Sequence, residues 1–287
     1  MNWSRAKTIL ILFFFVGNLI LGYQLWSDQG GVDGAGYVMG RDPEISLQER
    51  MRDYDLSLEA EMPEETPRLY RLQLSPAEVD LDAMRAALFG EAPVEPIMMG
   101  GEPAGYRGEE GLLVIGGPGA VRYRAMGPTS TEAVSEDRAR ELSEAFLEGP
   151  ALRPPGMTYD YANESIDEDK TVVYYRQEDG GLPMFGGGAI LGVTADGVVE
   201  YQRLWVAVGG NVGSPEPVLS ASSVLTANLP RIGQAVPGGV LVEVLLGYYS
   251  PMTEAAEWEA EPAWRLRFKD GTVVIVNAFT GAVEWPL

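Results

Sequence analysis

The stretch LPMFGGGAILGVTADGVVEYQRLWV, residues 182–206, contains two largely apolar segments on either side of an Asp-Gly pair. Residues 188–194 and 198–206 predict strands, because both are rich in β-branched and aromatic residues. Asp196 and Gly197 separate them, and Asp-Gly is typical of a tight hairpin turn. The stretch therefore predicts an antiparallel hairpin, which sets the fold class.

The chain around this hairpin predicts one order of elements twice, namely a helix followed by four strands. In residues 129–208 we expect a helix at 130–147 and strands at 157–163, 171–176, 188–194 and 198–206. In residues 209–287 we expect a helix at 220–229 and strands at 240–249, 263–268, 272–277 and 282–285, with Asp270-Gly271 as a hairpin turn. A helix on one face of an antiparallel sheet is the simplest packing, so both segments predict α+β modules.

Residues 46–128 predict a further module that mixes helix and strand. Ser46 and Glu49 have the spacing of a capping box, which predicts a short helix from Ser46 to Tyr54 with Leu47 and Met51 on one side. The other expected elements are a strand at 68–74, a helix that begins at Pro76, and a hairpin of 112–115 with 121–126.

The N-terminal residues have the pattern of a membrane anchor. An apolar run from Ile9 to Trp26 follows Arg5 and Lys7, and a helix needs about 20 apolar residues to cross a bilayer. Because basic residues stay on the cytoplasmic side, Arg5 and Lys7 predict a cytoplasmic N-terminus and an extracytoplasmic C-terminus. We expect residues 1–7 in the cytoplasm, 8–26 in the cell membrane as a single pass, and 27–45 as a Gly-rich linker.

A cleaved signal peptide is the alternative explanation of this N-terminus, because it also begins with positive charge. Its apolar core is usually about 7 to 15 residues long and ends at a site of small residues. The segment Ser27-Asp28-Gln29-Gly30-Gly31 offers no such site in the right place. The pattern favours an uncleaved anchor.

The composition excludes several classes of function. The chain of 287 residues has 42 acidic and 21 basic residues, a net charge of −21, and neither histidine nor cysteine. So acidic a chain repels nucleic acid and anionic headgroups, which excludes DNA and RNA as partners. Without imidazole or thiol it forms no Ser-His-Asp or Cys-His catalytic system, no usual zinc site and no disulfide.

Acidic pairs are the remaining candidates for catalysis, because glycoside hydrolysis needs only two carboxylates. Glu109 with Glu110, and the run Asp167-Glu168-Asp169, lie in predicted turns, where acidic residues are usually solvated. The second run also lacks the ligand spacing, glycine and distal glutamate of a calcium-binding loop. We therefore expect no catalytic, metal-binding or cofactor-binding residues.

Two short motifs have simpler explanations than a site. Gly186-Gly187-Gly188 could form a phosphate cradle, but it precedes a predicted strand and not a helix N-terminus, which favours a turn or bulge. Asn163-Glu164-Ser165 matches a glycosylation acceptor, a pattern that is common by chance.

Asn18 is the unusual residue of the anchor. An amide side chain in hydrocarbon gains by bonding to another helix, and Gly17 and Gly22 would let a neighbouring backbone approach closely. These three residues are the predicted contacts with a partner helix. A tolerated asparagine in an ordinary anchor is the alternative.

Several segments resemble the YycI family. They are NWSRAKTI at 2–9, GYQL at 22–25, the stretch at 182–206, LGYYS at 246–250, PAWRLRF at 262–268 and VVIVNAFTGAVE at 273–284. The resemblance covers nearly the whole chain and is weakest in the linker and between about residues 90 and 130. The closing segments are also similar to PepSY-like modules, which are inhibitory or binding units.

The resemblance implies a single-pass membrane protein with an extracytoplasmic α+β domain that works beside a YycH-like membrane protein. Together they are implied to regulate a WalK-type sensor histidine kinase of the WalRK two-component system, and so cell-wall metabolism. No catalytic residue is implied, and we expect Trp264, Tyr248 and Asn277 to be structural. The sequence leaves open the sign of regulation, any ligand, and a binding or inhibitor module for a wall enzyme or polymer as the alternative function.

Overall fold

The computed structural model describes residues 43–126, 132–164, 170–251 and 255–284. The chain divides into two units between Ser46 and Leu47, and the sheet lies in the unit Leu47–Leu287. Among the described residues no helix is both long and apolar enough to cross a membrane. The predicted anchor lies outside them, as do the residues assigned to topology and to helix contacts, namely Arg5, Lys7, Gly17, Asn18 and Gly22.

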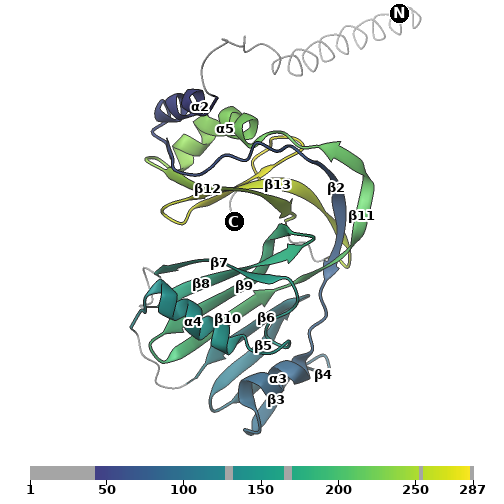
Figure 1. Cartoon of the computed structure of the whole chain (residues 1–287). Helices are drawn as coiled ribbons and strands as arrows, with labels where there is room; N and C mark the ends of the chain where they lie inside the picture. The colour runs from purple at the N-terminus through teal and green to yellow at the C-terminus, as the bar shows by residue number, and fades with distance from the viewer. Residues whose placement is uncertain (1–42, 127–131, 165–169, 252–254, 285–287) are drawn as a thin grey trace, which may run out of the picture. The chain divides into compact units, whose positions relative to one another are not determined.

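The protein is a mixed α+β structure with a large, mainly antiparallel sheet and few helices (Figure 1). The helices are α2 (Pro43–Arg52), α3 (Leu81–Phe89), α4 (Glu136–Phe146) and α5 (Ala221–Ala235). The strands are β1 (Ser57–Leu58), β2 (Arg68–Pro76), β3 (Val94–Met99), β4 (Glu102–Gly108), β5 (Gly111–Gly117), β6 (Ala120–Ala125), β7 (Met157–Glu164), β8 (Thr171–Asp179), β9 (Leu182–Thr194), β10 (Gly197–Leu204), β11 (Val206–Pro217), β12 (Val240–Tyr249), β13 (Trp258–Phe268) and β14 (Val273–Asn277).

The hairpin quoted from the sequence is at the centre of the sheet. β9 and β10 pair antiparallel around Asp196-Gly197, with Thr194 opposite Gly197, as predicted. The first part of β9 pairs with β12 instead, in parallel, through Met184 and Phe185. The strand order is β11-β2-β13-β12-β9-β10-β6-β5-β4-β3. β9 therefore joins two parts of the sheet.

Helices cover one face of each part of the sheet (Figure 1). α4 packs on β7 to β10, where its buried Ala139 shares a core with Leu113, Tyr175 and Tyr201. α5 buries Val224, Leu225, Leu229 and Ile232, which pack with Trp264, Leu266 and Phe268 of β13. Leu225, Leu229 and Ile232 are four and three residues apart and Val224 adjoins Leu225, so these side chains form one apolar stripe. Leu47 and Met51 of α2 are buried in this second core. The prediction that they lie on one side of the helix is confirmed.

Strand pairing crosses the boundaries between the predicted modules. β6 of the segment 46–128 pairs with β10 of the segment 129–208. β2 pairs with both β11 and β13. The predicted hairpins at Asp270-Gly271 and between β5 and β6 are confirmed.

Helix boundaries are wrong in four predictions. The helix expected from Pro76 begins at Leu81, because β2 runs through Pro76 and Asp80 caps the helix by accepting a hydrogen bond from the Ala83 N–H. α2 begins at Pro43, upstream of the predicted cap Ser46. α4 begins at Glu136 because Ser135 caps it, its side chain accepting a hydrogen bond from the Arg138 N–H. α5 continues through Pro230 to Ala235; buried Leu229 and Ile232 hold both sides of the proline in the core, which offsets one lost hydrogen bond.

Two strand predictions are also wrong. The strand expected at 198–206 ends at Leu204, and β11 then runs from Val206 to Pro217 through a Gly-rich segment for which no strand is predicted. Pairing with β2 stabilises this strand, with irregular register at two places. The strand expected at 282–285 is reduced, within the described residues, to one bridge between Val276 and Val283.

Candidate binding cleft

The open face of the sheet, opposite α4, forms the floor of a cleft of about 870 Å³. Residues directly opposite one another on paired strands share a face, so the register identifies this floor. One row across it is Tyr161, Tyr174, Ile190, Gln202 and Arg122. The next row is Arg176, Gly188, Leu204 and Ala120. All nine residues line the cleft. Its wall contains Arg265 of β13, Gly271 and Thr272 of the β13–β14 turn, and Val273 at the start of β14.

Asp160 is held in the wall of the cleft by two arginines. It is the extra residue of a bulge in β7, because Tyr159 pairs with Tyr175 while Tyr161 pairs with Tyr174. Bulges redirect side chains in this way. The Asp160 carboxylate accepts hydrogen bonds from Arg265 Nη1 and Nη2 at 2.5 and 2.7 Å, and from Arg176 Nη1 at 3.1 Å.

These ion pairs fix the charge state of the wall. Burial would raise the pKa of Asp160, but the hydrogen bonds and charges of Arg265 and Arg176 outweigh it and hold the pKa below its ordinary value. Burial also acts to lower the pKa of Arg265, and Asp160 with Glu243 outweighs that effect and raises it. Arg265 Nε also donates to Glu243 at 3.0 Å. Asp160 is therefore ionised at neutral pH, and both of its carboxylate oxygens accept hydrogen bonds from arginines.

Aromatic rings line the cleft beside the ion pairs. Tyr161 and Tyr174 stack with ring centroids 4.4 Å apart. Burial, followed by the nearby Tyr174 and Asp160, raises the pKa of Tyr161 to about 12. The guanidinium of Arg267 lies 4.8 Å from the Tyr161 ring centroid, and that of Arg265 lies 5.4 Å from the Phe185 ring centroid. The tyrosine hydroxyls stay protonated, so this part of the cleft offers apolar surface and hydrogen bonds.

The three glycines at 186–188 form an irregular part of β9 on the cleft floor. Arg176 pairs with Gly188 and Gln177 with Met184, so the intervening residues of β9 have no partner in β8. Gly188 has φ +155°, and a Cβ there would lie 2.2 Å from the Tyr175 carbonyl oxygen. The predicted turn or bulge is confirmed, and glycine is required for this close approach.

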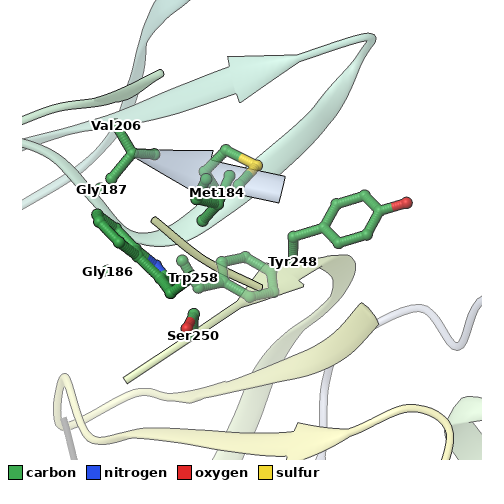
Figure 2. A pocket seen from close by; sticks show the side chains of 9 residues that line it. Met184, Gly186, Gly187, Val206, Tyr248, Ser250 and Trp258 are labelled. Atoms are coloured by element: carbon green, nitrogen blue, oxygen red, sulfur yellow. The ribbon is translucent and has the colours of Figure 1, made fainter. Parts of the chain in front are cut away.

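A much smaller cavity of about 20 Å³ lies next to the glycines (Figure 2). Its lining includes Met184, Val206, Trp258 and Ser250. This space holds about one water molecule, so the large cleft is the candidate binding site.

The acidic candidates from the sequence are not in the cleft. Glu109 and Glu110 are exposed between β4 and β5, and 167–169 lies outside the described residues. Asn163 is exposed on β7, while Ser165 of its motif is not described. No group of three or more acidic side chains in the described part of the chain is placed to hold a metal ion.

Asp160, Arg176 and Arg265 organise the cleft, and none of them was predicted as a site residue from the sequence. The signal was present, because Asp160 stands between two tyrosines in a predicted strand and Arg265 between apolar residues in another. Charges in such strands need partners when buried. Of the residues predicted to be structural, Trp264 is fully buried and donates from Nε1 to the Leu219 carbonyl at 2.9 Å.

Comparisons with known proteins identify a shared fold. No protein-family model and no curated protein matches the chain. An uncharacterized protein from Eubacterium rectale ATCC 33656 is similar, with a TM-score of 0.53 and 9% identity over 85% of this chain and 99% of that one. The YpeB C-terminal domain of Bacillus megaterium has a TM-score of 0.42 and 12% identity, over 74% of this chain and 97% of that one. YycH from Bacillus subtilis has a TM-score of 0.46 and 12% identity, over 75% of this chain and 53% of that one.

The similarity to the Eubacterium rectale protein at this identity concerns the fold alone. The other two TM-scores are below 0.5, and we base no conclusion on them. The YycI family stays a prediction from the sequence.

Proposed function

We propose that this protein is a membrane-anchored extracytoplasmic regulator that acts with a YycH-like protein on a WalK-type sensor histidine kinase. Residues 8–26 anchor the chain, with Arg5 and Lys7 on the cytoplasmic side. The segments similar to the YycI family support the choice of partners. In this proposal the described residues form the extracytoplasmic domain, built from PepSY-like modules, and control of cell-wall metabolism follows from the kinase.

The ion pairs of Asp160 in the cleft wall are the observation that supports a binding role. Asp160 is bound by two arginines, and its lowered pKa makes it a poor proton acceptor or donor at neutral pH. A wall with fixed, paired charges suits recognition. Regulation needs only a coupling free energy of about 1 to 3 kcal/mol between a contact and the two states of the kinase.

The test is an affinity purification from membranes of the full-length protein beside a version with residues 8–26 replaced by an unrelated anchor. Mass spectrometry identifies the proteins recovered with each. A sensor kinase and a YycH-like protein recovered only with the native anchor are the expected result. Recovery of a wall enzyme with either anchor would instead assign the function to the extracytoplasmic domain as a binding or inhibitor module.

Asn18 allows a sharper version of this experiment. Asn18→Leu keeps the anchor apolar and removes the amide, so we expect loss of complex and of kinase regulation. Asn18→Gln keeps an amide and is the matched control, expected to retain both. Unchanged complex formation and kinase output in Asn18→Leu would exclude Asn18 as a helix contact.

A further inference from the structure

The cleft floor is positively charged at one end, although the chain carries a net charge of −21. Arg122 and Arg124 of β6 lie on this face, and Arg122 makes no ion pair with any described residue. Arg124, with 74% of its side chain exposed, shares Glu200 with Lys170, at 3.4 and 2.7 Å. Arg124 is therefore largely solvated, and Arg122 adds a second exposed cation two residues away on the same strand.

The same floor carries apolar side chains beside the charges. Ile190 is 42% exposed, which is unusual for isoleucine in a central strand. It lies in one row with Gln202 and Arg122, on adjacent paired strands. Strands are about 4.8 Å apart, so Ile190 and Arg122 are separated by about 10 Å. Tyr174 extends the row on the other side of Ile190.

We propose that this face binds an extended, acidic segment of a partner protein. Arg122 and Arg124 are two residues apart on one strand, hence about 7 Å apart, which is also the spacing of alternate side chains in an extended peptide. Two carboxylates at alternate positions of the segment pair with the two arginines. An apolar side chain within about four residues of them covers Ile190 and Tyr174.

Charge and apolar surface together distinguish this occupant from others. An anionic glycan supplies charges for the arginines but no apolar side chain for Ile190. The exposed end of Gln202, between Ile190 and Arg122, provides donors and acceptors for the backbone of the segment. The proposal goes beyond the regulatory role and does not depend on it, because the face binds an acidic segment whichever protein is regulated.

The test measures fluorescence anisotropy of labelled peptides with the full-length protein in detergent micelles. One short peptide alternates Glu and Leu, a second Lys and Leu, and a third Glu and Ser. We expect the Glu/Leu peptide to bind, the Lys/Leu peptide to fail, and added salt to weaken binding. The double charge reversal Arg122→Glu with Arg124→Glu should lower the affinity for the Glu/Leu peptide about tenfold or more.

Matched variants separate the two parts of the surface. The Glu/Ser peptide has no apolar side chain and should bind native protein more weakly than the Glu/Leu peptide. Ile190→Ser should weaken binding of the Glu/Leu peptide and leave binding of the Glu/Ser peptide unchanged. Arg231→Glu, an exposed arginine on α5, changes the net charge without touching the cleft and should have no effect. Circular dichroism verifies that each variant is folded.

Five results would overturn the proposal. The first two are failure of the acidic peptides to bind native protein and equally tight binding of the Lys/Leu peptide. The third is binding of the Glu/Leu peptide that the double reversal leaves unchanged. The fourth is binding of dextran sulfate to the Ile190→Ser variant as tight as binding of the Glu/Leu peptide to native protein. Self-association that the double reversal abolishes would also overturn it, because the face would then bind a second copy. The anchor-exchange purification is a separate result, so either proposal can fail alone.

Discussion

Asp160 and Arg265 lie 105 residues apart in the sequence and meet as a bidentate pair. Their side chains are 5% and 7% exposed, so neither is compensated by water. Removing one partner of a buried pair leaves an uncompensated charge, which costs far more than the pair contributes. These two residues hold β7 against β13, and the cleft wall depends on them.

Asp160→Asn should therefore destabilise the protein by about 3 to 5 kcal/mol. Glu141→Gln is the control, because it removes the exposed pair with Arg138 on α4 and should cost less than about 1 kcal/mol. Thermal unfolding followed by circular dichroism measures both. Equal effects would show that the cleft pair is hydrated.

A double replacement measures how much of this cost comes from the unpaired charge. Asp160→Leu with Arg265→Met removes both charges, and we expect it to be less destabilised than Asp160→Asn alone. A double variant as unstable as the sum of its single variants would mean that the two charges act independently.

Gln177 of β8 contacts the start of β11 through side-chain hydrogen bonds, where the two strands do not pair. Its side chain is buried, and its amide donates to the Val206 carbonyl at 2.6 Å and accepts from the Val206 N–H at 3.1 Å. Val206 is where the chain leaves β10 and begins β11. The amide thus satisfies the backbone at a point where the ladder changes partners.

Gln177→Leu should cost about 2 to 5 kcal/mol, because both backbone groups of Val206 lose their partner inside the protein. Gln73→Leu is the matched control, since the Gln73 side chain makes one long, exposed hydrogen bond among the described residues, at 3.5 Å to Glu257. Hydrogen exchange at the Val206 amide should accelerate in Gln177→Leu alone. Unchanged exchange would show that other groups protect this junction.

Gly188 sets the course of β9 across the cleft floor. Gly188→Ala should destabilise the protein by at least about 1 to 3 kcal/mol, because its φ is unfavourable for alanine and the new Cβ meets the Tyr175 carbonyl oxygen. Gly116→Ala on β5, where the nearest atom is 3.7 Å away, is the control and should be nearly neutral. Equal unfolding temperatures for both variants would contradict the strain expected when alanine replaces Gly188.

Elements with local signals were predictable, and elements that depend on distant partners were not. Asp196-Gly197 predicts the hairpin of β9 and β10 because the turn and both strands are adjacent in sequence. β11 carries three glycines and two prolines and forms through pairing with β2, more than a hundred residues earlier. The cleft was missed for the same reason, because Asp160 and Arg265 look like isolated charges until the fold brings them together.

At the scale of the whole molecule, two electrostatic effects oppose each other as pH falls. The net charge of −21 destabilises the folded state by repulsion at neutral pH, and protonation relieves it. Asp160, Glu144 and Glu261 act in the other direction, because each has a pKa below its ordinary value in the folded state. Their stabilisation is complete above the pKa of the unfolded chain, about 4, and is lost as pH falls through the folded pKa.

The unfolding temperature should therefore have a maximum on the acid side of neutrality, at about pH 5 to 6. Above it, added sodium chloride should raise the unfolding temperature by screening repulsion, and this effect should shrink as pH falls toward the maximum. Below it, stability should fall steeply, and Asp160→Asn should make this fall shallower because its side chain no longer titrates. An unfolding temperature that rises steadily from pH 5 to pH 8 and ignores salt would mean that ion pairs dominate and that repulsion among the acidic side chains is already screened.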